Sequence, residues 1–161
     1  MMPSAPRVTA LIIGLALLAP LRLVAQHGED EVLAAVHQLF QAMRARDTVA
    51  LRAVFDSTAD LVTTAPDGQG GFTTRRVAVD DFVTSIGRLT VEVDERIHDP
   101  EVRIDGGLAS VWAPYDVYVN GTLSHCGVDA FHLTRASSGW RIVAVADTRR
   151  REGCSGPVGG R

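Results

Sequence analysis

The feature that most constrains the fold of this chain is the dipeptide Asn120-Gly121, which separates two long segments rich in β-branched and aromatic residues, 108–119 and 122–134. Both central residues of a two-residue type I′ turn need positive φ, and Asn followed by Gly adopts that conformation at the least cost. The sequence therefore predicts an antiparallel β-hairpin whose turn is formed by Asn120 and Gly121.

The register of this hairpin determines which polar side chains share a face, because side chains alternate between the two faces of a strand. The simplest register starts with Val119 opposite Thr122 and continues without interruption. It brings the following side chains together on one face: Trp112, Asp116, His125, Asp129 and Phe131. Pro114 and Gly127 would then face each other, where a missing N–H and a missing side chain indicate a bulge. A bulge there would reverse the alternation beyond it.

Other segments continue the pattern of strands. Residues 140–147 carry apolar side chains at both parities, which is typical of a central strand covered on both sides. Residues 89–97 and 101–105 alternate apolar with polar residues and predict half-exposed strands. Residues 60–64 are a shorter strand candidate. The loop 65–71 follows it and is an exposed connection or, alternatively, a mobile lid over a pocket.

Two helices are expected at the start of the folded part. Apolar residues recur at helical spacing over residues 30–46, with Asp30 as the predicted cap, and form a single buried stripe. Asp47 then caps a second, shorter helix that ends before residues 56–58. The single capping residue between the helices predicts a sharp corner.

A third helix is predicted over residues 79–87, with Asp80 or Asp81 as its cap and Gly87 at its end. Helices that come first and strands that follow as a meander indicate the α+β class, with helices on one face of a mostly antiparallel sheet. A strongly curved sheet around the first helix would form a cone with an open end, and small ligands bind in such concavities.

The first residues have the composition of a secretory signal peptide. Within residues 1–25, an arginine precedes an apolar run too short to be a typical membrane span, and polar residues follow Ala25 abruptly. Cleavage near Ala25 would leave one domain over residues 26–154 and a disordered tail over residues 155–161. A retained membrane anchor is the alternative, because Arg22 lies unusually close to the cleavage site.

Charge and composition limit the partners of the mature chain. Loss of the two arginines in the signal peptide would change the formal net charge from −3 to −5, which disfavours nucleic acid. All 16 basic residues are Arg, which indicates GC-rich and hence bacterial coding. We therefore expect an exported bacterial protein, periplasmic or secreted, with no membrane contact after cleavage.

The two cysteines are expected to form a disulfide. Cys126 and Cys154 are the complete set, and an even number in an oxidising compartment favours pairing. The bond would tie the C-terminal segment back across the hairpin. The alternative, a catalytic Cys126 activated by His125, is disfavoured because adjacent strand residues point to opposite faces.

The strongest chemical constellation lies on the hairpin. The candidate catalytic residues are His125, Asp129 and Asp116, because an imidazole flanked by carboxylates can serve as a general base. The candidate ligand-binding residues combine apolar walls with polar groups: Trp112, Tyr115, His125, Asp129 and Phe131. The simpler interpretation is an ordinary Asp116–His125 pair on a solvated sheet face.

No metal or cofactor is expected. His132 is expected on the opposite face of the strand from His125 and Asp129, so a single metal ion cannot be coordinated by all three. The glycines of the loop 65–71 are followed by no Lys-Ser/Thr pair and do not form a phosphate-binding motif.

Several segments together match the pattern of a known family: 32–55, Val111-Trp112-Ala113-Pro114-Tyr115, Ser124-His125-Cys126-Gly127-Val128-Asp129-Ala130-Phe131, Gly139-Trp140-Arg141-Ile142 and Asp147-Thr148-Arg149. On these segments the chain resembles the nuclear transport factor 2-like superfamily of cone-shaped domains, over residues 32–154. The His-Cys-Gly segment is similar to a branch of exported bacterial proteins labelled lumazine-binding.

This resemblance implies a cone that holds a small, partly apolar ligand. The superfamily includes ketosteroid isomerase, scytalone dehydratase, limonene epoxide hydrolase and polyketide cyclases, together with members that catalyse nothing, so the fold leaves the reaction open. We expect a small-molecule-binding domain. One alternative is a cofactor-free isomerase, dehydratase or hydrolase with His125 and Asp129 as its acid–base pair. The other is a homodimeric interaction module that uses the sheet face and holds no ligand.

Overall fold

The computed structural model describes residues 19–154, which form the predicted α+β fold with one strand more than predicted between the second and third helices. The helices are α1 (Ala19–Ala45), α2 (Thr48–Ala53) and α3 (Val79–Gly87). The strands are β1 (Phe55–Pro66), β2 (Phe72–Ala78), β3 (Val93–Ile97), β4 (Glu101–Asp105), β5 (Leu108–Val119), β6 (Thr122–Ala136) and β7 (Gly139–Thr148). The predicted tail, residues 155–161, and most of the predicted signal peptide, residues 1–18, lie outside the described part.

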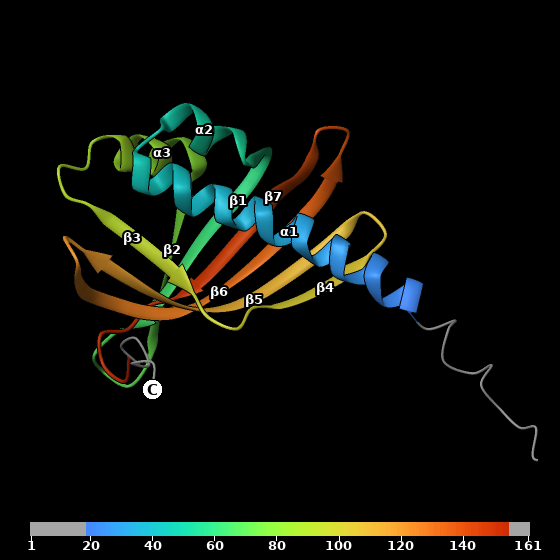
Figure 1. Cartoon of the computed structure of the whole chain (residues 1–161). Helices are drawn as coiled ribbons and strands as arrows, with labels where there is room; N and C mark the ends of the chain where they lie inside the picture. Colours follow the sequence, from blue (N-terminus) through green and yellow to red (C-terminus); the bar gives the residue numbers. More distant parts are fainter. Residues whose placement is uncertain (1–18, 155–161) are drawn as a thin grey trace, which may run out of the picture.

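The strands form one curved, mostly antiparallel sheet in the order β2-β1-β7-β6-β5-β3, and β4 also pairs with β5. β1 and β7 are parallel, whereas the other neighbouring strands are antiparallel. The predicted central position of residues 140–147 is confirmed, because β7 pairs on both sides. The helices lie together on one face of the sheet, and α1 crosses it (Figure 1). We call this covered face the inner face.

The core lies between α1 and the inner face. Val36 and Phe40 of the predicted helical stripe are buried, and the ring of Phe40 packs edge-on against Phe131 of β6 at 6.2 Å between centroids. Phe131 is 1% exposed and is one of the largest fully buried side chains. Burial of such side chains contributes about 2–3 kcal/mol each. Among residues 19–154, no helix is long and apolar enough to span a membrane.

The first helix starts earlier than predicted. α1 begins at Ala19, so Asp30 is an interior residue and not a cap. Pro20 lies in the first turn, where its missing N–H costs no helical hydrogen bond, so the helix can start there. The cap of α2 is confirmed: the Asp47 carboxylate accepts hydrogen bonds from the backbone N–H groups of Val49 at 3.1 Å and Ala50 at 2.9 Å.

The predicted cap of α3 is wrong. The cap position is Ala78, which has no side-chain hydrogen bond, because β2 runs directly into the helix. Asp80 and Asp81 lie in the first turn instead, where their negative charge favours the helix dipole. β2 itself was not predicted, because its mostly exposed side chains show no apolar alternation.

The turn of the long hairpin is confirmed. β5 ends at Val119, β6 begins at Thr122, and these two residues pair as predicted. Asn120 and Gly121 have φ values of 49° and 77°, as a turn with two left-handed residues requires.

The register beyond the turn differs from the prediction, because β6 contains a bulge at Ser124. Val117 pairs with His125, so Ser124 has no partner in the β5–β6 ladder. The bulge predicted at Pro114 and Gly127 is absent: Pro114 pairs with Val128 and Gly127 with Tyr115, without a register shift. The extra residue moves every later residue of β6 to the opposite face relative to β5.

This shift separates the predicted catalytic residues. Asp116 pairs with Cys126, so the predicted pairing of Asp116 with His125 is wrong. His125 and Asp129 share the inner face with Tyr115, whereas Trp112 and Asp116 point to the outer face of the sheet.

Candidate functional site

A cavity of about 570 Å³ lies between the inner face and the helices, within the size range of small-ligand pockets. Most of its wall is apolar and comes from α1, α3 and the strands: Leu39, Phe40, Met43, Phe55, Leu61, Phe82, Ile86, Val117, Phe131 and Val145. Its polar lining includes exposed residues such as Arg75 and Arg149, so the cavity opens to solvent. The structure therefore has the concavity expected of a cone.

Four of the predicted site residues line this cavity. They are Tyr115, His125, Asp129 and Phe131, and each is buried from bulk solvent. Trp112 does not line it: on the outer face it is 53% exposed.

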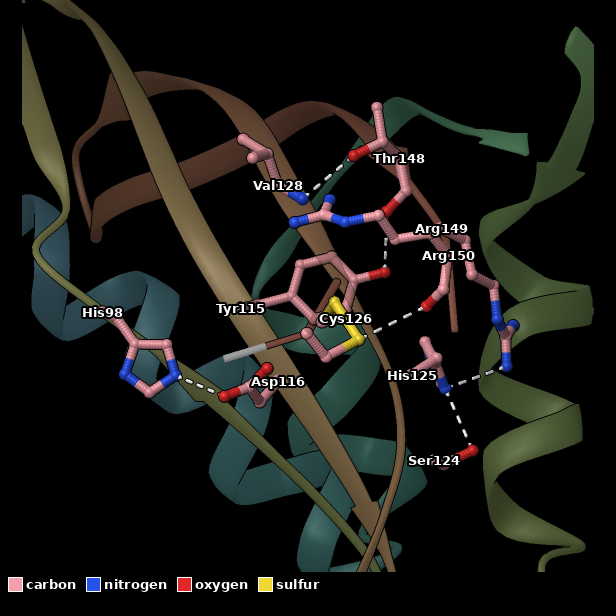
Figure 2. Close-up of a disulfide and its surroundings, with 11 residues drawn as sticks. His98, Tyr115, Asp116, Ser124, His125, Cys126, Val128, Thr148, Arg149 and Arg150 are labelled. Carbon is pink, nitrogen blue, oxygen red and sulfur yellow. Dashed lines mark hydrogen bonds and ion pairs between the residues drawn. A yellow bond between two sulfur atoms is a disulfide. The ribbon is translucent and has the colours of Figure 1, made fainter. Parts of the chain in front are cut away.

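Asp116 is also remote from the cavity. Asp116 is 3% exposed, and its carboxylate lies 3.0 Å from Nε2 of His98. Figure 2 shows this pair. His98 is thus the partner of Asp116, in place of the predicted His125. This pair stabilises the outer side of the sheet, and Asp116 takes no part in the cavity.

The acidic centre of the cavity is a pair of carboxyl groups, Glu95 of β3 and Asp129 of β6. A hydrogen bond between them requires a proton on one of them, and the raised pKa values of both groups favour that proton. Burial is the main reason why the pKa of Glu95 is raised from 4.5 to about 7, and the negative charge of Asp147 adds to the effect. Burial, and then the neighbouring Glu95, also raise the pKa of Asp129 well above its usual value. One proton is therefore held between two groups that would both be ionised in water.

Asp147 completes what we call the acid cluster, which consists of Glu95, Asp129 and Asp147. It lies directly opposite Asp129 in the β6–β7 ladder, and Thr63 of β1 lies on its other side. The Thr63 hydroxyl donates a hydrogen bond to the Asp147 carboxylate at 2.7 Å. Burial raises the pKa of Asp147, although Thr63, Arg149 and Tyr115 act in the opposite direction.

Tyr115 provides a hydrogen-bond donor beside this cluster. Its hydroxyl donates to the Thr148 carbonyl at 2.9 Å (Figure 2). The same hydroxyl lies 3.5 Å from Oδ2 of Asp147. Burial, followed by the charge of Asp147, raises the pKa of the phenol, so it remains protonated. Gly127 makes this arrangement possible, because a Cβ at that position would lie 1.7 Å from the Thr148 oxygen.

His125 is a neutral imidazole in this environment. Burial is the first cause that lowers its pKa to about 4, and the positive charges of Arg149 and Arg151 are the next. A guanidinium nitrogen of Arg149 lies 3.3 Å from Nδ1, and the Ser124 hydroxyl lies 3.1 Å from the same atom (Figure 2). A guanidinium only donates, so Nδ1 accepts and the ring proton is on Nε2. The carboxylates expected to make His125 more basic are replaced by arginines that make it less basic.

The disulfide holds the arginine-bearing segment in place. Cys126 and Cys154 are bonded as predicted, with their Cα atoms 5.6 Å apart. Backbone hydrogen bonds in both directions also join Cys126 to Arg150. The chain after β7 is thereby fixed along β6, which keeps Arg149 next to His125 (Figure 2).

Sequence reasoning missed Glu95, Asp147 and Arg149 as site residues. A signal was present for Glu95, because it shares a strand parity with Val93 and Ile97 and is therefore a carboxylate on an apolar face. Within residues 19–154, no group of three His, Cys, Asp or Glu side chains has the geometry to hold a metal ion.

Comparison with known proteins identifies the fold. No family model and no curated protein matches the sequence. Solved structures do match, among them an NTF2-like protein with a cystatin-like fold from Novosphingobium aromaticivorans, with a TM-score of 0.64, 17% identity, and coverage of 90% of this chain and 95% of that one. An NTF2-like protein from Cytophaga hutchinsonii has a TM-score of 0.63, 14% identity, and coverage of 76% and 98%. A protein from Streptomyces avermitilis, named as a candidate dehydratase of the NTF2-like family, has a TM-score of 0.56, 15% identity, and coverage of 76% and 95%.

These matches show that the chain has the nuclear transport factor 2-like fold, which the sequence predicted. At such low identity they establish the fold alone, and the function has to be argued from the cavity.

Proposed function

We propose that the protein binds a small, partly apolar ligand inside the cone. The observation that carries this proposal is the cavity of about 570 Å³, whose apolar walls surround the buried polar side chains of Asp129 and Tyr115. Such a combination gives a ligand apolar contact and a fixed orientation. A pure interaction module has no need of this cavity, and the predicted lumazine-binding label has no specific support among the lining residues.

Binding can be tested with Nile red, a neutral apolar dye that fluoresces in apolar surroundings. The substitution Val145→Phe adds volume to the cavity wall, whereas Val128→Phe adds the same kind of side chain on the outer face. We expect saturable binding to the wild type and to Val128→Phe, with affinity for Val145→Phe reduced by about tenfold or more, which corresponds to about 1.4 kcal/mol. Equal binding by all three proteins would place the dye outside the cavity and count against the proposal.

Acid–base catalysis is the second candidate, because Glu95 and Asp129 share a proton at the cavity wall. Two carboxyl groups with one proton can remove a proton from one atom of a substrate and return it to another. In this version Glu95 replaces His125 as the partner of Asp129, because the lowered pKa of His125 makes its imidazole a weak proton acceptor. A cofactor-free isomerase or dehydratase would use this chemistry.

Proton abstraction can be tested without knowledge of the product. A panel of cyclic ketones is incubated with the protein in D₂O, and exchange of the hydrogens next to the carbonyl is followed by NMR. Catalysis predicts exchange by the wild type that Asp129→Asn abolishes and that Glu92→Gln, at an exposed position, leaves intact. Exchange that survives in Asp129→Asn would rule out the pair as its source.

Export and dimerisation complete the proposal. The Cys126–Cys154 disulfide supports an oxidising compartment. The outer face carries the exposed Trp112 beside the small side chain of Ala130, a surface suited to a second copy of the chain. N-terminal sequencing of the protein recovered from the periplasm or medium tests cleavage near Ala25, and an intact N-terminus would contradict it.

A further inference from the structure

The polar part of the cavity is acidic, and Asp129 in it is short of hydrogen-bond donors. Asp129 is 4% exposed, and apart from the proton that it shares with Glu95, no hydrogen-bond donor among the described residues reaches its Oδ2 atom. Buried carboxyl groups with a single proton between them lack donors for their other oxygen lone pairs, and a ligand donor would recover the free energy that this costs. Asp129 is therefore available to bind a ligand, and Glu95 and Asp147 line the cavity next to it.

The charges that face the acid cluster do not balance it. The hydroxyl donors of Thr63 and Tyr115 are directed at Asp147 and at the Thr148 carbonyl. Arg149 acts on the cluster from the end of β7, but it is exposed and also contacts the neutral His125.

The remaining elements around the cavity add little positive charge. α1 contributes only apolar side chains to the lining: Leu39, Phe40 and Met43. α3 adds the exposed Asp81, and β2 adds the exposed Arg75, which pairs across the strands with Thr63. The three carboxyl groups therefore face an apolar space with no buried cation among the described lining residues.

We propose that the acid cluster binds the ammonium group of an organic amine whose apolar body fills the rest of the cavity. This inference rests on the proposed function and names its ligand class. An ammonium group has three donors and no acceptor, so it can satisfy several carboxylates at once. Its hydrogen bonds to carboxylates are charge-assisted and are about twice as strong as neutral ones. A hydroxyl group donates only one hydrogen bond and leaves the second carboxyl unpaired.

The proposal implies a proton exchange on binding. In the empty cavity, Glu95 and Asp129 hold one proton between them. A bound ammonium favours the ionised form of both, so the shared proton leaves as the cation enters, and the net charge of the site is unchanged. Amine binding near neutral pH should therefore release up to about one proton per chain.

Benzylamine and benzyl alcohol provide a matched test, because they differ in the ammonium group and share the apolar ring. Binding of each to the full chain is measured by calorimetry in two buffers with different ionisation enthalpies, which reports the protons released. We expect benzylamine to bind about tenfold more tightly than benzyl alcohol and to release protons. Glu95→Gln and Asp129→Asn should remove the preference and the proton release, and the exposed Glu92→Gln should retain both.

The outcomes separate this inference from the proposed function. Equal or tighter binding of benzyl alcohol, or amine binding without proton release, would overturn the amine assignment. Failure of benzylamine to bind while Nile red binds would also overturn it and leave the proposed function intact. Failure of benzylamine, benzyl alcohol and Nile red together would overturn both.

Discussion

Replacement of Glu95 by Gln is expected to stabilise the protein at alkaline pH. In the unfolded chain Glu95 titrates near 4.5, whereas in the folded protein its pKa is about 7. Between these values the folded state binds a proton that the unfolded state has lost, so the free energy of unfolding falls as the pH rises. The stabilisation from protonated Glu95 is fully present below pH 4.5 and is lost as the pH passes through about 7.

The size of the effect follows from the same interval. One pKa unit corresponds to about 1.4 kcal/mol, so a rise from 4.5 to about 7 corresponds to about 3 kcal/mol. Glu95 and Asp129 share the proton, so this value belongs to the pair. The E95Q variant keeps a neutral amide that can donate to Asp129. We expect E95Q to be more stable than the wild type by about 2–3 kcal/mol at pH 8 and by less than about 1 kcal/mol at pH 5.

Urea unfolding from pH 5 to pH 8, without reductant, measures this prediction. Trp140 is 7% exposed and its fluorescence will report unfolding, whereas Trp112 is already 53% exposed. The control is E92Q, which makes the same chemical change at an exposed position. A pH dependence in E95Q that parallels the wild type would refute the shared proton, as would an equal gain in E92Q.

The other predictions concern the disulfide, Gly127 and the outer face. Simultaneous replacement of Cys126 and Cys154 by Ala should lower the free energy of unfolding by about 3–4 kcal/mol, because the disulfide closes a loop with a cysteine separation of 28 residues. A loss below about 1 kcal/mol in urea unfolding would contradict this. Gly127→Ala should cost about 1–3 kcal/mol or more, because its Cβ would lie 1.7 Å from the Thr148 oxygen, and an unchanged melting temperature would show that the chain relaxes easily. Trp112→Ala should change the stability of one chain by less than about 0.5 kcal/mol but should dissociate the proposed dimer in sedimentation velocity; a dimer that persists would exclude Trp112 from the contact.

The sequence predicted the fold well because its strongest signals are local. The Asn120-Gly121 turn, the helical stripe around Phe40 and the cap Asp47 each depend on residues close in sequence, and the structure contains all three. The faces of the hairpin were predicted wrongly because one extra residue, Ser124, reverses the parity of all that follows. Ser has no conformational signature for a bulge, so nothing in the sequence marked that position.

The acid cluster was beyond local prediction because it is assembled by pairing between distant strands. Glu95 meets Asp129 across β5, and Asp147 joins them from β7, so three separate registers must be known before the carboxyl groups can be placed together. A carboxylate on the apolar face of a strand costs free energy of desolvation. Glu95 lies on such a face, together with Val93 and Ile97. Such a residue indicates a cavity before the partner strands are known.

The sequence correctly marked Gly127 as a special position, but the predicted reason, a bulge, was wrong. Its missing side chain indicated a bend opposite Pro114, but the ladder is regular there. The space is used by the Thr148 carbonyl, which reaches Tyr115 through the gap and accepts its hydroxyl hydrogen bond. That contact holds the end of β7 over β6 and thereby sets the positions of Asp147 and Arg149 at the cavity. The bulge at Ser124 places Asp129 on the inner face, and Gly127 allows the end of β7 to approach, so that Asp147 lies next to Asp129. A register without the bulge would instead place Asp129 opposite Trp112, on the outer face, and would therefore remove it from the acid cluster while leaving the turn, the helices and the composition of the sheet unchanged.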